Sequence, residues 1–125
     1  MTRRVLVVDG ANVVGSRPDG WWRDRAAAAR RLHGRLAVAD TDHDEIVLVL
    51  EGQARAGVPR GRDGHVLTMH APRDGDSAVV DAVRRAAEAG DAVVVVTADR
   101  GLRLRVEVLG ARTMSPGWLL DALGD

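Results

Sequence analysis

Acidic side chains recur in one kind of place in this chain, just after a run of aliphatic residues. Asp9 ends the run in RVLVVDGANVVG, Glu51 ends the run in VLVLEG, and Asp99 follows VVVVT by two residues. A fourth acid, Asp76, opens a predicted helix in the stretch DGDSAVVDAV. Ligands of parallel α/β sheets bind beyond the carboxyl ends of the strands, so we expect these four carboxylates to share one rim.

Carboxylates that lie close together raise one another's pKa unless cations neutralise them. The four His residues form no ligand pair on a helix face and the chain has no Cys, so the donors are oxygens, which suit Mg²⁺ or Mn²⁺ better than Zn²⁺. The competing interpretation is helix capping, for which Asp is well suited and for which Asp76 and Asp99 are the better candidates. Glu51 fits capping poorly, because Gly52 follows it rather than a helix. The sequence therefore predicts a magnesium or manganese site formed by Asp9, Glu51, Asp76 and Asp99.

The elements that position these acids form an alternating pattern. Three β-branched runs, 5–8, 46–50 and 92–97, do not alternate apolar with polar residues, which is typical of strands buried on both faces. Weaker strands are expected at 65–68 and 111–114, and helices at 21–39, 77–89, 100–109 and 115–123. This order predicts a three-layer α/β/α sandwich with a central, mainly parallel sheet, in a single domain spanning 1–125.

Cationic and hydroxyl side chains around the acids are candidates for substrate binding. The 18 basic and 18 acidic residues cancel, so attraction of a polyanion must be local. Residues 52–64 form a glycine-rich stretch that is expected to be an irregular, functional loop. The candidate phosphate-binding or metal-water-binding residues are Asn12, Ser77, Thr97, Arg55, Arg60, Arg62, Arg73 and Arg100. The alternative is an ordinary solvated arginine face.

The tandem Trp21-Trp22 lies at the start of the first predicted helix. We expect at least one of the two rings to pack in the core, while the other is a candidate for stacking on an unpaired base.

Several function classes find no support in the sequence. Gly10 and Gly15 complete neither a dinucleotide fingerprint nor a phosphate-binding loop, and no G-x-S-x-G nucleophile motif is present. No apolar run approaches the roughly 20 residues that span a bilayer, and the first run is too short for a signal-peptide core. The expected location is the cytoplasm, with no membrane partner.

The order and spacing of VVDGANVVG, VLVLEG, DGDSAVVDAV and VVVVTADRGL resemble the PIN-like nuclease superfamily, specifically its NYN-domain branch, from residue 4 to about residue 114. The resemblance implies a PIN-like fold and a metal-dependent ribonuclease that hydrolyses RNA phosphodiester bonds, with single-stranded or structured RNA as partner. The residues that it places around the metal are Asp9, Asn12, Glu51, Asp76 and Asp99. In this resemblance, Asn12 either orients a carboxylate or holds a phosphate oxygen.

Two departures from that family pattern keep other functions open. Glu51 stands where Asp is more usual, and its longer side chain is expected to shift or loosen that metal ligand. Ser77 follows Asp76 where many relatives have a second acid, which weakens the expectation of a second metal. One alternative is a nucleotide phosphohydrolase that uses the same acids. Another is a catalytically weak RNA-binding or partner-binding module, and a protein partner or a homo-oligomer is compatible with any of these.

Overall fold

Six strands form one sheet in the order β3-β4-β2-β1-β5-β6 in the computed structural model, which describes residues 2–124. The strands are β1 (Arg4–Asp9), β2 (Glu45–Leu50), β3 (Gly61–Asp63), β4 (Val66–His70), β5 (Ala92–Val96) and β6 (Arg112–Met114). Every neighbouring pair is parallel except β3–β4, which is antiparallel. The predicted mainly parallel sheet is confirmed.

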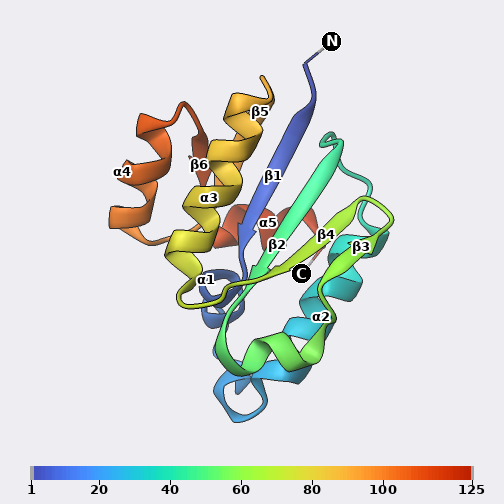
Figure 1. Ribbon diagram of the computed structural model, residues 1–125. Helices are drawn as coiled ribbons and strands as arrows, with labels where there is room; N and C mark the ends of the chain where they lie inside the picture. The colour runs from blue at the N-terminus through green and yellow to red at the C-terminus, as the bar shows by residue number, and fades with distance from the viewer. Residues whose placement is uncertain (1, 125) are drawn as a thin grey trace.

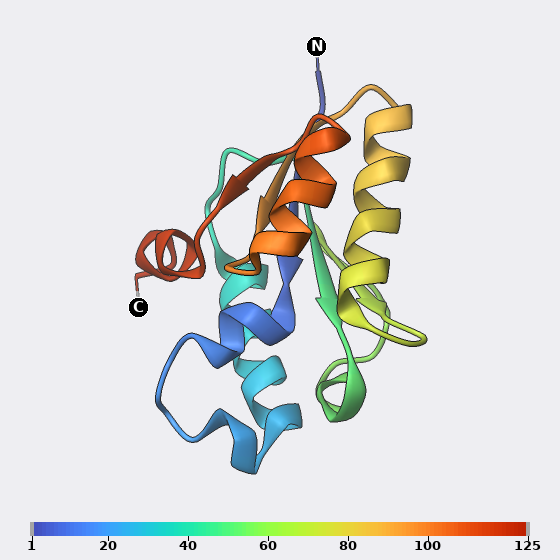
Figure 2. The same ribbon diagram turned by 90° about the vertical axis from the view of Figure 1, so that its left-hand side faces the viewer.

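Helices cover both faces of this sheet, which confirms the three-layer arrangement (Figures 1 and 2). The helices are α1 (Gly10–Gly15), α2 (Arg25–Val38), α3 (Gly75–Glu88), α4 (Arg100–Val108) and α5 (Pro116–Ala122), with 3₁₀ turns η1 (Trp21–Arg23) and η2 (Gly52–Gly57). α3 and α4 lie side by side on one face, and α1, α2 and α5 pack on the other. Within residues 2–124, no helix has the length and hydrophobicity needed to cross a bilayer.

The central strands are apolar on both faces because each face meets a layer of helices. Val5 and Val7 of β1 belong to the core beneath α3 and α4. Leu6 and Val8 belong to the opposite core, beneath α2 and α5. Burial of alternate residues on both sides holds β1 rigidly up to its last residue, Asp9.

Three local predictions were wrong. Residues 21–39 are not one helix, because the Asp24 carboxylate accepts a hydrogen bond from the Ala27 amide (3.0 Å) and starts a new helix, α2, after the 3₁₀ turn η1. Residues 52–64 are not irregular, since they contain η2 packed on α2 and the edge strand β3 paired with β4. Neither ring of Trp21-Trp22 packs in the core, because no residue of η1 is buried.

Candidate functional site

Asp9 is a buried carboxylate at the carboxyl end of the central strand β1, with 3% of its surface exposed. Its Oδ2 accepts hydrogen bonds from Asn12 Nδ2 at 3.0 Å and from Thr97 Oγ1 at 2.9 Å. Charge-assisted hydrogen bonds of this kind favour the ionised carboxylate. Asp9 is therefore held in one orientation by two elements that are far apart in sequence, α1 and the segment after β5.

Asn12 and Thr97 connect the ends of β1 and β5. The amide oxygen of Asn12 accepts a hydrogen bond from the Ala98 backbone amide (3.2 Å), while its amide nitrogen donates to Asp9. Thr97 Oγ1 donates to Asp9 and accepts from the Asp99 backbone amide (3.2 Å). Both side chains therefore position the acids, and for Asn12 these contacts favour the role of orienting a carboxylate. Thr97 was expected to bind substrate, but 0% of its surface is exposed, so a substrate cannot contact it.

Asp99 caps α4, and this capping role was one of the two interpretations of its sequence position. Its Oδ1 accepts a hydrogen bond from the Leu102 amide at 3.0 Å. Its backbone amide is held by Thr97 Oγ1, so the same residue that orients Asp9 also places Asp99.

Glu51 connects the end of β2 to the start of α3. Its Oε2 accepts a hydrogen bond from the Gly75 amide at 2.9 Å, and a Cβ at Gly75 would lie 3.0 Å from Glu51 Oε1. Gly75 thus provides the space that the longer Glu side chain needs. This contact brings Glu51 beside the first turn of α3, where Asp76 lies.

The cap of α3 is Asp74 rather than Asp76, which corrects the sequence interpretation. Asp74 Oδ1 accepts from the Ser77 amide (2.8 Å) and its Oδ2 accepts from Ser77 Oγ (3.1 Å). These hydrogen bonds hold the pKa of Asp74 below its ordinary value. Ser77, which was expected to bind substrate, forms these capping hydrogen bonds with Asp74. Asp76 lies in the first turn of α3 and does not cap the helix.

Asp9 and Asp76 interact electrostatically with one another and with neighbouring acids. Burial raises the pKa of Asp9 above its ordinary value of 3.8, hydrogen bonds from Thr97 and Asn12 lower it in part, and the Asp76 charge raises it. Burial also raises the pKa of Asp76, and the charges of Asp99, Asp74 and Glu51 add to that increase. The charge of Asp76 thus opposes ionisation of Asp9, and the charges of Asp99, Asp74 and Glu51 oppose ionisation of Asp76.

The donors at this rim are carboxylate oxygens, the kind of ligand that hard divalent cations prefer. Within residues 2–124, no three or more His, Asp or Glu side chains are grouped closely enough to hold a metal ion on their own. Mg²⁺ usually keeps several waters and is bound through one or two carboxylates. The oxygen donors and their mutual repulsion at Asp9 and Asp76 suit such a water-rich site.

Two cationic side chains near the rim carried no signal in the sequence. Arg103 of α4 donates from Nε to the Thr97 carbonyl oxygen at 3.0 Å. Arg105, also on α4, is close enough to Asp74 and Asp76 for its positive charge to lower the pKa of each. Their helix has no periodic pattern that distinguishes these arginines from solvated ones, so only the packing of α4 against α3 reveals them.

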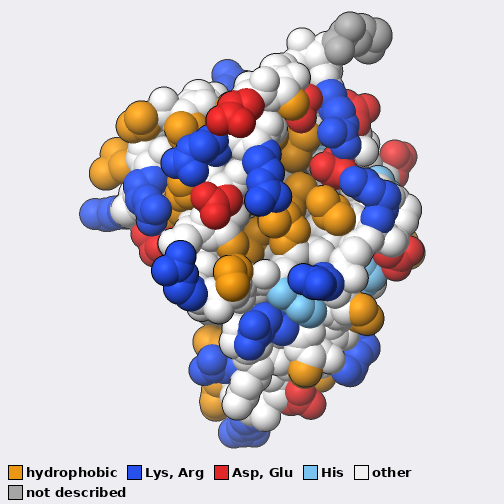
Figure 3. All heavy atoms as spheres, viewed as in Figure 1, with side chains coloured by type: hydrophobic (Ala, Val, Ile, Leu, Met, Phe, Trp, Pro, Cys, Tyr) orange, Lys and Arg blue, Asp and Glu red, His pale blue; other side chains and the backbone are white. Residues whose placement is uncertain are grey.

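The predicted arginines do not all reach the rim. Arg62 of β3 pairs with the buried Glu45 carboxylate (Nη2–Oε2, 2.6 Å). Since Glu45 is the first residue of β2, Arg62 lies near the amino end of this parallel strand, whereas Asp9 lies at the carboxyl end of β1. Arg62 therefore does not belong to the candidate site. Arg73 and Arg100 are exposed beside Asp74 and Asp99, Arg55 donates from Nε to the Gly52 carbonyl oxygen (3.1 Å), and Arg60 is exposed after η2. On the side of the molecule seen in Figure 3, basic and acidic side chains are interspersed and form no continuous basic field.

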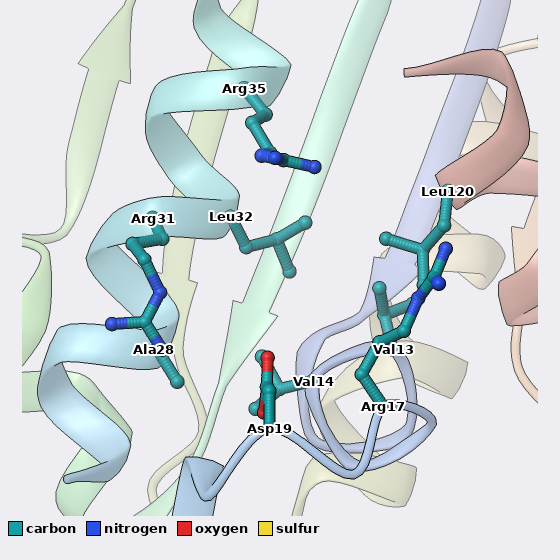
Figure 4. A pocket seen from close by; sticks show the side chains of 9 residues that line it. All are labelled: Val13, Val14, Arg17, Asp19, Ala28, Arg31, Leu32, Arg35 and Leu120. Carbon is teal, nitrogen blue, oxygen red and sulfur yellow. The ribbon is translucent and has the colours of Figure 1, made fainter. Parts of the chain in front are cut away.

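A separate pocket of about 120 Å³ lies between α1, α2 and α5. Figure 4 shows Arg17, Arg31 and Arg35 around it, with Asp19 at the loop end and Leu32 and Leu120 on its walls. None of the predicted acids Asp9, Glu51, Asp76 and Asp99 lines it. Arg17 therefore belongs to this pocket and not to the acidic rim.

The buried hydroxyl of Thr97 yields a prediction on stability. Thr97→Val keeps the shape of the side chain but removes a donor to Asp9 and an acceptor for the Asp99 amide, so we expect the free energy of unfolding to fall by about 2 kcal/mol. Thr68→Val is the matched control, because within the described chain Thr68 Oγ1 is buried without a hydrogen-bond partner. The free energy of unfolding of Thr68→Val is expected to rise by about 1 kcal/mol. Urea unfolding of both variants measures the two effects, and a stabilised Thr97→Val would contradict the positioning role.

The whole fold has a counterpart among solved structures. The crystal structure of a mutant of Rae1 (YacP) from Bacillus subtilis matches this chain with a TM-score of 0.76 and 19% sequence identity. The match covers 97% of this chain and 75% of that one. No family model and no curated protein matches the sequence. At this identity the likeness establishes a shared fold, and the chemistry rests on the residues of this chain.

Proposed function

We propose that this chain is a metal-dependent ribonuclease of the PIN-like type, in its NYN-domain branch, which hydrolyses RNA phosphodiester bonds at the acidic rim. The observation that carries the proposal is the buried Asp9 carboxylate, fixed by Asn12 and Thr97 and coupled electrostatically to Asp76. A buried carboxylate near other carboxylates is energetically unfavourable unless a cation neutralises it, so this arrangement favours a cation site. The mainly parallel sheet supports a site at the carboxyl ends of its strands, where ligands of such sheets bind.

The side chains divide the work. Asp9, Asp76 and Asp99 would hold Mg²⁺ or Mn²⁺, directly or through water, and Glu51 would support the site while holding the start of α3. A divalent ion bound there supplies positive charge to the phosphate and lowers the pKa of water for attack. Asn12 and Thr97 keep Asp9 oriented, while the exposed Arg73 and Arg100 can neutralise flanking phosphates.

A cleavage assay tests the proposal. Purified protein is incubated with end-labelled single-stranded RNA and, separately, with nucleoside triphosphates, each with Mn²⁺ and with a chelator in its place. The nuclease hypothesis predicts RNA fragments that require Mn²⁺ and no turnover of triphosphates. Turnover of triphosphates without RNA cleavage would favour a nucleotide phosphohydrolase, and RNA binding without either reaction would favour a binding module.

Arg60 offers a test of how RNA is held. Arg60 is exposed in the connection between η2 and β3, so Arg60→Ala is expected to weaken RNA binding by roughly the contribution of one phosphate contact and to flatten the salt dependence accordingly. Hydrolysis of a minimal phosphodiester, which does not reach beyond the rim, is expected to change little. Equal losses on RNA and on the minimal substrate would contradict a binding role for this segment.

A further inference from the structure

A pocket of about 280 Å³ opens directly beside the acidic rim. It lies between α1, the start of α2 and the segment that follows β2, and its lining includes Gly10, Ala11, Trp21, Arg25, Glu51 and Arg73. Its volume is close to the lower end of the roughly 300–1,000 Å³ typical of small-molecule sites. The pocket is therefore of a size for one small planar group rather than for a large ligand.

The pocket and the rim share walls. Gly10 follows Asp9 in the chain, and it lines the pocket at the base of α1. Glu51 lines the pocket as well, while its carboxylate accepts the hydrogen bond from Gly75, the neighbour of Asp76. A group seated in this pocket would lie next to whatever the acids of the rim bind.

The lining combines flat, apolar and charged surfaces. The Arg25 guanidinium lies 5.3 Å from the centroid of the Trp21 ring, and both side chains line the pocket. Val14, Leu50 and Ala54 supply apolar walls. Unpaired bases stack on aromatic rings and on arginine guanidinium planes, and their polar edges require hydrogen-bonding partners such as a carboxylate. Arg73 at the pocket supplies positive charge for an attached phosphate.

We infer that this pocket is a nucleobase subsite, which holds one base of the RNA strand while the adjacent phosphate lies at the acidic rim. The inference deepens the proposed function and rests on it for the identity of the polymer. Trp21 and Arg25 provide the stacking surface, Glu51 the polar edge, and Arg73 the contact to phosphate. Selection among bases would arise here, because the rim itself contacts only the phosphate group that is common to all nucleotides.

Two variants with the same chemical change separate the pocket from the rest of the surface. Ala11 is exposed in the first turn of α1 and lines the pocket, so Ala11→Leu would fill it. Ala56 is exposed in η2 and does not line it, so Ala56→Leu is the matched control. The probes are adenosine 5′-monophosphate and ribose 5-phosphate, measured by calorimetry without any divalent metal.

The expected results follow from the stacking contribution of a base, about 1–3 kcal/mol. The wild type should bind adenosine 5′-monophosphate about tenfold more tightly than ribose 5-phosphate. Ala11→Leu should remove that difference and Ala56→Leu should retain it. In the wild-type protein, the indole N–H resonance of Trp21 should shift with the nucleotide and not with the sugar phosphate, a measurement that depends on no variant.

Equal affinity for the two probes, or an Ala11→Leu protein that binds the nucleotide as the wild type does, would overturn the subsite. This outcome is separable from failure of the ribonuclease hypothesis, which is judged by Mn²⁺-dependent cleavage. Base-dependent binding in a protein that cleaves no RNA retains the pocket and rejects the nuclease. Cleavage without base-dependent binding retains the nuclease and rejects the pocket.

Discussion

Asp9→Asn is expected to reduce Mn²⁺-dependent RNA cleavage by more than about 100-fold, because loss of even an outer partner of a metal site typically costs about 10–100-fold. The substituted side chain keeps the size of Asp and an oxygen that can accept from Asn12 and Thr97. It lacks the negative charge that a cation requires. The measurement is the initial rate of cleavage at saturating Mn²⁺.

The same substitution is expected to stabilise the fold near neutral pH. The pKa of Asp9 is raised in the folded protein, chiefly by burial, so the ionised form is less favoured in the folded state than in the unfolded state. The free energy of unfolding of the wild type is therefore lowered at pH values above the folded pKa and recovers as the pH falls through it. Asp9→Asn should therefore be more stable than the wild type at pH 7. This difference should shrink as the pH falls through the pKa of Asp9 in the folded protein.

Asp81→Asn is the matched control for both measurements, the cleavage rate and the free energy of unfolding. Asp81 lies on α3 and is exposed, and it pairs with Arg84 one helical turn away at 3.2 Å. Removal of its charge should change neither cleavage nor stability by a large factor. If Asp9→Asn retained cleavage at the wild-type rate, Asp9 would be a structural residue and the proposed site would be wrong.

Gly57→Ala is expected to have the largest effect on stability. Gly57 ends η2 where it packs against α2, and a Cβ at this position would collide with the backbone of Ala26, at its carbonyl group and Cα. Backbone atoms inside a helix cannot move away as a side chain can. We expect a loss of about 3 kcal/mol in the free energy of unfolding, measured by urea denaturation.

Gly34→Ala is the matched control for that loss. Gly34 lies inside α2, and a Cβ there would meet no atom within 4 Å. Since Gly in a helix interior costs roughly 0.5–1 kcal/mol relative to Ala, this variant is expected to be more stable than the wild type. A stable Gly57→Ala protein would mean that η2 is not held against α2 as described.

The strands and the rim were predictable because their signals are local and strong. Runs such as VLVV and VVVV have no polar face, so they indicate burial on both sides, and the rule for parallel sheets then places Asp9, Glu51 and Asp99 at one edge. The Asp74 cap was also within reach of the sequence, since Asp is a good N-cap and Ser77 follows it by three residues.

Other features depend on packing that no local pattern records. The pairing of Arg62 with Glu45 requires β3 to form the edge strand of the sheet, and the glycine-rich composition of residues 52–64 does not indicate a strand there. The role of Thr97 depends on its meeting Asp9 across 88 positions of sequence. Glu51 was interpreted as a loosened metal ligand, whereas its contact with Gly75 shows a further task, that of holding the start of α3.

Calorimetric titration of Mn²⁺ into the wild type, Asp9→Asn and Asp81→Asn tests the central idea most directly, because it measures whether the acids gather around a cation without depending on any substrate. We expect saturable binding to the wild type and to Asp81→Asn, with none detectable for Asp9→Asn. Binding to the wild type should weaken as acidification protonates Asp9 and Asp76, whose pKa values are raised. Equal binding to all three proteins, or no binding to the wild type, would contradict the account.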